Sequence, residues 1–387
     1  MEFTLIASKL DKLETRINRL ANKAEKFGLP PISLTIVSCS TETKRVNGVD
    51  ISYPIVTVEI SGVDVAPTIN GWSFLATIEH TPAGNIVRSF SDTDISETYR
   101  TADATCEHCN QNRQRNNTYV LMNENGDTKQ VGSTCLVDFI GNTDAEKIAS
   151  FYAGISIEAI LDELNSNEEE YDNYGSTSSF SIVQFVASVL LAVEELGFYA
   201  GSDSDNPTKH TAMSILVDGT DISSKMDEAR EVIEAIKNYI SSKHRINDYL
   251  HNINIILSGD YMEYRHIGFV ASTYVLVKKL SEQKIEEGLP ENVSTHVGVV
   301  GEKLQNVPVT FVAQHGFETQ WGYSSFLKFA DSDGNILVWK TSSDPTVDGK
   351  FIEEGCEYVL IVATIKAHDE FNDKAQTNIL RCKLASE

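Results

Sequence analysis

The hydrophobic positions near the N-terminus follow a helical period. From about Thr4 to Phe27, apolar residues recur at spacings of four and three, at Ile6, Leu10, Leu13, Ile17, Leu20, Ala24 and Phe27. This pattern predicts a short coiled coil or a helix docked on a sheet. Gly28 and the Pro30–Pro31 pair predict its end. We expect the helix to pack on its own domain, with a dimer contact as the alternative.

The next hydrophobic positions alternate as they do in strands. β-Branched residues with partial alternation occupy 32–37 and 55–60, and similar patterns follow at 72–79 and 86–90. Such residues favour the half-buried surface of a sheet. The sequence therefore predicts a small sheet after the N-terminal helix.

The middle of the chain is helical in pattern, from about residue 145 to 280. A helix is predicted at 155–164, followed by an acidic, Ser-rich loop at 166–179. Residues 180–196 are apolar nearly all round, which is typical of the central helix of a bundle. We expect a helical bundle that ends at the Gly288–Pro290 linker.

The C-terminal part, from about Val297, returns to strand patterns. Five strands are predicted, at 307–312, 325–329, 336–340, 358–366 and 377–383, with a hairpin turn at Asp331–Asn335. Five short strands suit a small Greek-key barrel of the OB type. An SH3-like barrel or a sandwich has the same spacing.

Together these patterns predict an α+β multidomain protein. Residues 1–143 form an N-terminal domain of a helix and a small sheet, with a metal-binding insertion at about 104–140. An acidic helical domain follows at 144–290, and an OB-like β-barrel at 297–387.

Composition and charge narrow the class of protein. The 387 residues are 41% hydrophobic and 23% charged, which is typical of a globular protein of two or three domains and excludes collagenous, disordered and disulfide-scaffold chains. The net charge is −24, and residues 141–300 carry −15 of it, from 26 acidic and 11 basic residues. This segment repels polyanions, so any contact with them must use the ends of the chain.

The first residues are not typical of a signal peptide, and the longest apolar run, Phe180–Val193, is too short to span a bilayer. We therefore expect a cytoplasmic protein without membrane contact. In a reducing compartment its six cysteines are thiols or metal ligands rather than disulfides.

Three cysteines have the spacing of a zinc module. Cys106-Glu-His-Cys109 is a close pair, and Cys135 follows two predicted strands, 117–122 and 128–131, that an Asn125–Gly126 turn joins. Such a hairpin returns the third thiolate to the pair, as in a zinc ribbon or treble clef. We predict a structural zinc ion here; three unrelated buried thiols are the alternative.

A structural zinc site needs a fourth ligand. We favour His80, because it ends the strand 72–79 and can reach the site through sheet pairing. His108, Cys39 or water are alternatives, although a side chain at position 108, inside the pair, tends to point away from the ion. Glu107 could serve a catalytic zinc, but the spacing does not match the deaminase pattern, and we predict no catalytic residues.

Basic and aromatic residues near the ion indicate a nucleic-acid surface. Arg113 and Arg115 occupy a polar loop without acids, with Tyr119 and Lys129 on the strands beside it. These groups can hold phosphate while a ring stacks on a base. The alternative is that the arginines are solvated or pair with nearby acids.

The barrel offers a second surface of the same kind. Its aromatic and basic residues are Phe317, Trp321, Tyr323, Phe326, Trp339, His315, Lys328, Lys340, Lys366 and His368. About half of the rings must fill the core. We expect Trp321, Tyr323 and Lys366 to be the exposed members that contact a single strand.

Three segments resemble a family of large proteins carried by bacteriophages and plasmids. They are the end of the first helix (Leu20–Pro30), the block from Cys106 to Phe139, and the tail from Ala363 to Arg381. The zinc block and the tail are the most specific parts. The resemblance implies a bacterial host cell as the setting and a role in nucleic-acid metabolism or host defence.

We therefore predict a non-enzymatic, zinc-stabilised protein that binds single-stranded DNA or RNA. The alternative partner is a host protein: an acidic DNA mimic would occupy the DNA-binding surface of a defence or DNA-processing enzyme, and the acids around Glu168–Glu170 motivate this idea. A hydrolase or transferase ranks lower, because the helical middle has no P-loop or nucleophile–base pair.

Overall fold

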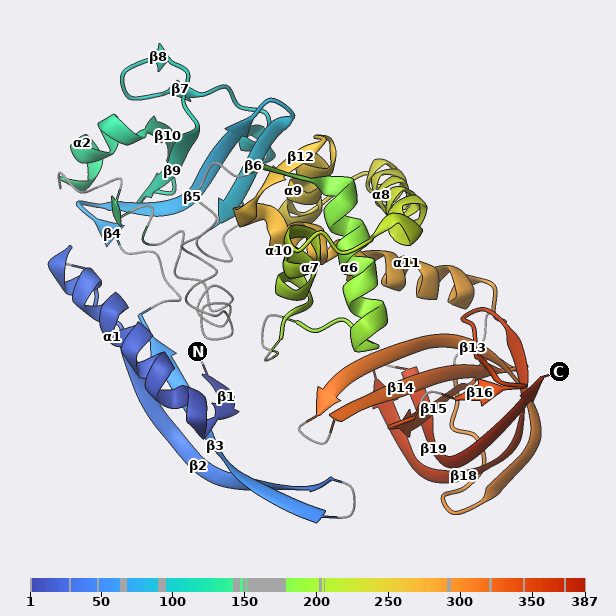
Figure 1. Ribbon diagram of the computed structural model, residues 1–387. Coiled ribbons are helices and arrows are strands. Elements are labelled where there is room, and N and C mark those ends of the chain that lie inside the picture. The colour runs from blue at the N-terminus through green and yellow to red at the C-terminus, as the bar shows by residue number, and fades with distance from the viewer. Residues whose placement is uncertain are drawn as a thin grey trace. The chain divides into compact units, whose positions relative to one another are not determined.

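The computed structural model describes residues 2–27, 29–46, 49–62, 68–89, 95–141, 147–148, 151, 179–201, 204, 206–290, 294–319, 322–343, 345–371 and 374–386. The chain forms two compact units (Figure 1), Met1–Val189 with Gly201–Thr273 and Leu190–Ala200 with Tyr274–Glu387. The predicted domain borders fall at or beside residues outside this description and stay predictions. The same holds for the predicted helix at 155–164 and the acids around Glu168–Glu170.

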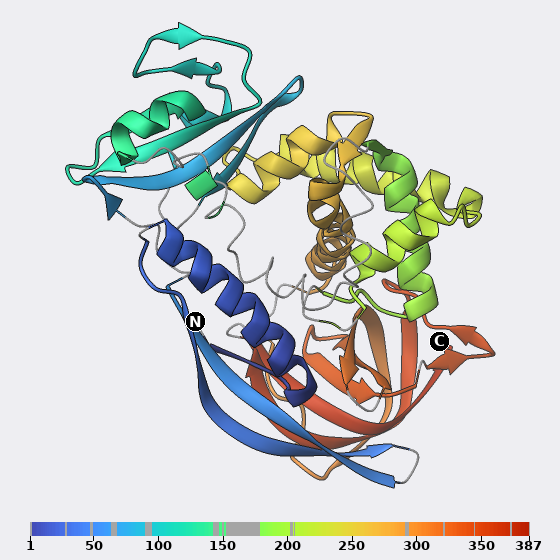
Figure 2. The same cartoon turned by 60° about the vertical axis from the view of Figure 1, so that its left-hand side comes forward.

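A three-stranded antiparallel sheet carries the first helix. Its order is β1-β3-β2, from β1 (Glu2–Ile6), β2 (Ser33–Val46) and β3 (Val49–Ser61). The helix α1 (Leu10–Lys26) lies along the β2–β3 hairpin (Figure 2). Leu13 and Ile17 of α1 share a buried cluster with Val58 and Ile60 of β3, so the apolar stripe of the helix faces its own sheet.

The helix predicted from Thr4 begins later, at Leu10. The residues before it pair with β3, with Phe3 opposite Val58 and Leu5 opposite Val56. Backbone pairing with a distant strand thus outweighs the helical period there, because the backbone groups of residues 2–6 find their partners on β3.

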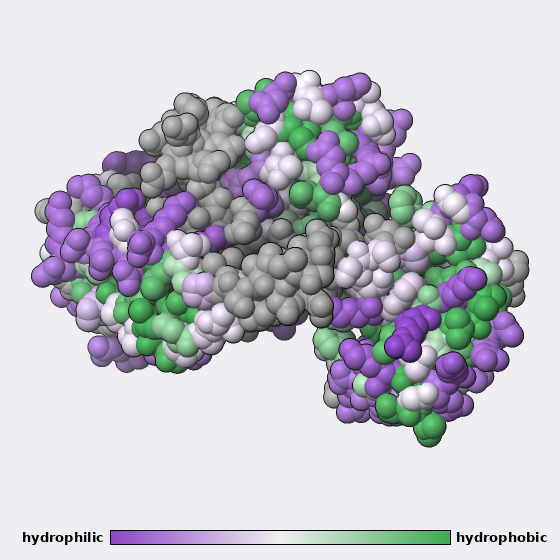
Figure 3. Space-filling model, turned by 60° about the horizontal axis from the view of Figure 1, so that its bottom comes forward, coloured by the Kyte–Doolittle hydropathy of each residue, from purple (hydrophilic) through white to green (hydrophobic). Residues whose placement is uncertain are grey.

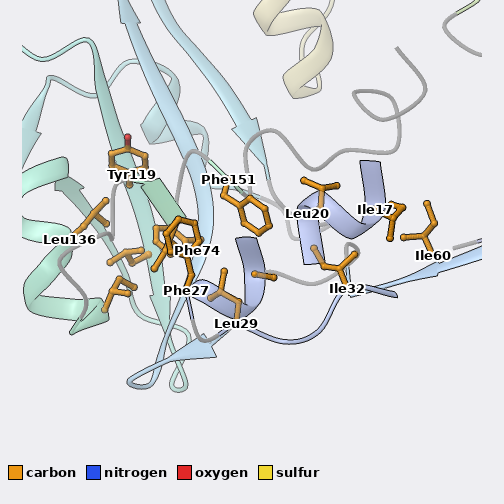
Figure 4. Packing of buried hydrophobic residues seen from close by; sticks show 14 of the residues in the cluster. Ile17, Leu20, Phe27, Leu29, Ile32, Ile60, Phe74, Tyr119, Leu136 and Phe151 are labelled. Atoms are coloured by element: carbon orange, nitrogen blue, oxygen red, sulfur yellow. The ribbon is translucent and has the colours of Figure 1, made fainter. Parts of the chain in front are cut away.

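The second sheet has the order β10-β9-β5-β4. In addition, β6 pairs with residues 76–81 of β5, beyond the short segment that pairs with β4. Its strands are β4 (Thr68–Ile69), β5 (Trp72–Thr81), β6 (Gly84–Ser89), β9 (Asn117–Asn123) and β10 (Thr128–Gly132). Phe74, Tyr119 and Leu136 join the buried cluster of α1 (Figure 4). The predicted hairpin is confirmed, and Gly126 has the left-handed φ of +85° that its turn requires.

The first unit also contains a group of helices. They are α7 (Thr208–Val217), α8 (Met226–Ser241), α9 (Asp248–Leu257) and α10 (Ile267–Ala271), with the start of α6 (Ile182–Leu196) and the short strands β11 (Ser179–Ser181) and β12 (Tyr261–Glu263). The Asn252 amide of α9 accepts from the Val87 N–H at 2.9 Å and donates to the Val87 carbonyl at 2.7 Å. A side chain thereby satisfies the free edge of β6.

The second unit is built on a closed five-stranded barrel with the order β13-β14-β15-β19-β18. The strands are β13 (Lys303–Thr319), β14 (Gly322–Asp331), β15 (Ile336–Thr341), β18 (Glu357–Phe371) and β19 (Lys374–Ser386); β16 (Thr346–Val347) and β17 (Lys350–Phe351) form a small hairpin. The strands β15 and β19 run parallel, and the other barrel pairs are antiparallel. Phe311 and Phe329 fill the interior. The predicted five strands are confirmed.

The helix α11 (Thr273–Glu287) covers part of the outer face of this barrel. Ile285, together with Leu289 beyond the helix, packs on Val312, Ala330 and Val338. Figure 3 shows hydrophilic residues over most of the described surface on one side, with hydrophobic residues in smaller groups between them. Within the described residues, no helix has both the length and the apolar character needed to cross a membrane.

Candidate metal centre

Three cysteines come together in the first unit. The sulfur atoms of Cys106, Cys109 and Cys135 lie within 4.8 Å of one another. Cys106 ends β7 (Thr105–Cys106), and Cys135 ends the 3-10 helix η3 (Ser133–Cys135), which directly follows β10. The β9–β10 hairpin therefore returns the third thiol to the first two. Three thiols at this separation can hold one metal ion.

Hydrogen bonds to the free edge of β10 fix the turn that carries Cys106 and Cys109. The Glu107 N–H donates to the Gln130 carbonyl at 2.9 Å, and the Gln130 N–H donates to the Glu107 carboxylate at 2.5 Å. The buried side-chain amide of Gln130 also donates to the Asp103 and Thr105 carbonyls, at 2.7 and 3.1 Å. The sheet edge thus sets where the pair of thiols lies.

Arg115 closes the loop after the pair. Its guanidinium donates to the carbonyls of Ala104 and Gln111 at 2.5 and 2.9 Å. A Cβ on Gly132 would lie 2.5 Å from Arg115 Nε, so a larger residue there would displace the Arg115 side chain. The guanidinium of Arg115 thus holds the loop through its Nη1 group, and the predicted phosphate contact of Arg115 stays a prediction.

The thiols differ in acidity. Burial opposes the ionisation of Cys106, but hydrogen bonds from the backbone of Cys109, Gly132 and His108 outweigh it and lower the pKa of Cys106 to about 7. Burial and the neighbouring sulfurs of Cys106 and Cys109 raise the pKa of Cys135 to about 12. A bound cation would favour the thiolate form of all three, because metal ligation displaces thiol protons.

A second group of ligand atoms shares Cys135. His108, Cys135 and Asp138 also have ligand atoms within 4.8 Å of one another, and His108 Nδ1 is 3.4 Å from Asp138 Oδ2. Asp138 belongs to the first turn of α2 (Leu136–Ile140). Sequence reasoning missed Asp138, although Cys135-x-x-Asp138 repeats the spacing of the first pair of cysteines.

His80, the predicted fourth ligand, belongs to neither group. Its ring nitrogens lie 2.9 Å from Asn85 Oδ1 and 2.8 Å from Thr118 Oγ1. The Asn85 amide donates to the carbonyls of Tyr99 and Ala102, so His80 Nδ1 donates to Asn85 and Nε2 is left to accept from Thr118. Burial lowers the pKa of His80, which favours this neutral form. In this structure both ring nitrogens of His80 are used in hydrogen bonds within the sheet, and its role as a ligand stays a prediction.

A cluster of rings adjoins the cysteines. Trp72 and Phe139 meet edge to face at 5.0 Å, and His108 approaches Phe139 at 5.1 Å. The Lys129 ammonium lies 5.9 Å from the Trp72 ring centre and 5.8 Å from that of Phe139. Lys129 therefore already makes cation–π contacts.

The other predicted nucleic-acid residues have different positions. Tyr119 is only 3% exposed and cannot stack on a base, because β9 directs it into the core, whereas Arg113 is exposed. On the barrel Lys366 is exposed, while Trp321 and the side chain of Tyr323 lie outside the described residues.

Two other barrel residues, Phe326 and Lys340, make a surface pair. Phe326 of β14 is 39% exposed, and the Lys340 ammonium of β15 lies 5.4 Å from its ring centre. Sequence reasoning placed both among the barrel aromatics and lysines but could not select them, because pairing across neighbouring strands depends on register.

Comparison with protein-family models, with curated proteins and with solved structures found no match to this chain.

Proposed function

We propose that this chain is a zinc-stabilised, non-enzymatic protein of a bacteriophage or mobile element that binds single-stranded nucleic acid through its barrel. The observation that carries the proposal is the strand order β13-β14-β15-β19-β18, closed by a parallel β15–β19 pair. If the five barrel strands are numbered in chain order, the third (β15) pairs with the fifth (β19), and the fourth (β18) pairs with the first (β13). This order supports an OB-type barrel, whose second and third strands bind oligonucleotides.

The face of β14 and β15 has suitable chemistry for a single strand. Phe326 provides an exposed ring for a base, and the neighbouring Lys340 provides a cation for a phosphate. Stacking on an aromatic side chain contributes about 1–3 kcal/mol per base without sequence preference. Lys366 is a further exposed cation on the same barrel.

Zinc is the metal that the thiols favour. Three sulfur ligands exclude magnesium and calcium, which bind oxygen. The turn that carries Cys106 and Cys109, the β9–β10 hairpin and the short helix α2 have the arrangement of a treble-clef-like module. We assign the ion a structural role, because ligand sets dominated by thiolates are typical of structural zinc sites.

The test is fluorescence anisotropy of the full chain with labelled single-stranded DNA and RNA over a range of salt. Phe326→Ala with Lys340→Ala should weaken binding roughly 5- to 150-fold, as expected for about 1–3 kcal/mol. The matched control is Lys350→Ala with Phe351→Ala, which removes an exposed lysine and an exposed ring from β17. Absence of binding at low salt, or equal effects of both pairs, would refute the proposal.

A further inference from the structure

We propose that Asp138 is the fourth ligand of the metal centre, so that the ion is held by three cysteines and one aspartate, and that His108 holds the aspartate from outside. This inference rests on the zinc centre of the proposed function. Structural zinc takes four ligands, and three thiols lie together. Among the described residues, only His108 and Asp138 have ligand atoms that form a further close group with one of these thiols.

The local helix brings Asp138 to the side of Cys135. Cys135 has helical backbone angles, φ −81° and ψ −11°, and directly precedes α2, with Asp138 three residues later. Side chains three residues apart lie on the same face of a helix. The first pair of cysteines has the same spacing, so each half of the module would supply two ligands from one turn of backbone.

The carboxylate is in position to turn toward the sulfurs. Its side chain is 57% exposed and is directed at His108 Nδ1, 3.4 Å away. The carboxylate groups with Cys135 but not yet with Cys106 and Cys109, so we expect the side chain to rotate at the surface when it presents an oxygen to the ion. The distance to the nearest thiol is already short, because Cys135 and Asp138 have ligand atoms within 4.8 Å of each other.

His108 fits the outer role better than the ligand role. It lies between the two cysteines of the turn, and its ring packs edge to face on Phe139 at 5.1 Å. Carboxylates that bind metals are usually themselves hydrogen-bonded, and such outer partners orient the ligand. With Nδ1 facing Asp138, His108 can donate to the carboxylate oxygen that does not face the metal.

The test counts thiolates on Co²⁺ in the full-length protein under reducing conditions. Cobalt replaces zinc in tetrahedral sites and absorbs in proportion to the number of bound thiolates. Asp138→Cys should raise the thiolate-to-cobalt absorption from that of three sulfurs to that of four. His108→Cys should leave the absorption at three sulfurs, and it is the matched variant because both residues face Cys135.

A second measurement uses zinc affinity. Asp138→Ala should weaken zinc binding by more than 10-fold, while Glu124→Gln, an exposed acid at the β9–β10 turn, should not change it. A fourth thiolate from His108→Cys but not Asp138→Cys, or from neither, would overturn the assignment of Asp138 alone. A wild-type protein that binds neither zinc nor cobalt would overturn the zinc centre as well. Binding of single strands by the barrel is measured separately and would stand in both cases.

Discussion

At the scale of single residues, His80 and Asp138 show how short contacts divide structural from ligand roles. Asp138 is three residues from Cys135, and His80 belongs to β5 of the sheet whose edge strand positions the cysteines. Both side chains carry suitable ligand atoms. The nitrogens of His80 are used by Asn85 and Thr118, whereas the Asp138 carboxylate is half-exposed near Cys135. A partly buried side chain that is already hydrogen-bonded would lose these hydrogen bonds if it turned toward a metal ion.

Replacing His80 with alanine should therefore leave the zinc in place but destabilise the fold. It would leave the side-chain oxygen of Asn85 and the Thr118 hydroxyl without this partner, which costs about 1–3 kcal/mol. The measurements are zinc content and urea unfolding with saturating zinc. A variant that loses its zinc while it remains folded would show that His80 is a ligand after all.

The stability lost in His80→Ala should depend on pH. Burial lowers the pKa of His80 below its usual 6.5, so the unfolded chain binds this proton first as pH falls. The contribution of His80 to the free energy of unfolding is therefore complete above about pH 6.5 and declines below it. Wild type and His80→Ala should approach each other in stability on acidification.

At the scale of elements, the contact between α11 and the barrel has a consequence for the proposed binding face. Glu282 lies 2.7 Å from Lys328 and 3.3 Å from His315, and Glu286 contacts Lys328 and, at 3.0 Å, Lys374. The hydrogen bond from His315, together with Lys328, lowers the pKa of Glu282 to about 2 despite burial. The helix thus neutralises two barrel lysines, and one of them, Lys328, is two residues from Phe326 on β14.

Glu282→Gln with Glu286→Gln should therefore tighten binding of single-stranded DNA. Two lysines become available to phosphates, which should steepen the dependence of log Kd on log salt by up to about 1.4, at about 0.7 per contact with a single strand. The apolar contacts of Ile285 and Leu289 remain to hold the helix. Anisotropy titrations at several salt concentrations measure both effects.

The matched control is Glu287→Gln with Glu357→Gln, which removes the same charge from exposed positions of α11 and β18. If the control tightens binding as much as the first pair, net charge alone explains the change. The argument for a specific contact would then fail.

At the scale of the whole molecule, the proposed metal centre and the barrel belong to different compact units with separate buried clusters. Removal of zinc should therefore destabilise the first unit and leave the barrel unit nearly unchanged. If free zinc exceeds its Kd by about 1,000-fold, its loss costs the first unit about 4 kcal/mol.

Calorimetry with a chelator tests this expectation. One unfolding transition should move to lower temperature and the other should stay in place. In Cys135→Ser, which lacks one of the proposed zinc ligands, the chelator should have no further effect. Cys39→Ser should behave as wild type, because Cys39 belongs to neither close group of ligand atoms. A common shift of both transitions would contradict the expectation.

The sequence by itself determined the features that depend on neighbouring residues. The apolar stripe of α1, the Asn125–Gly126 hairpin and the five barrel strands follow from periodicity and turn chemistry, which act over a few residues. The return of Cys135 to the Cys106–Cys109 pair also follows, because a hairpin returns the chain to its starting point.

Only the tertiary structure decided the features that depend on distant partners. Residues 2–6 form β1 because they pair with a distant strand, and Tyr119 is buried in the core. The ring nitrogens of His80 make hydrogen bonds with Asn85 and Thr118. It also placed the acids of α11 on the barrel lysines. Each is a choice between partners far apart in the chain, and burial and hydrogen bonding make that choice only when the whole fold is assembled.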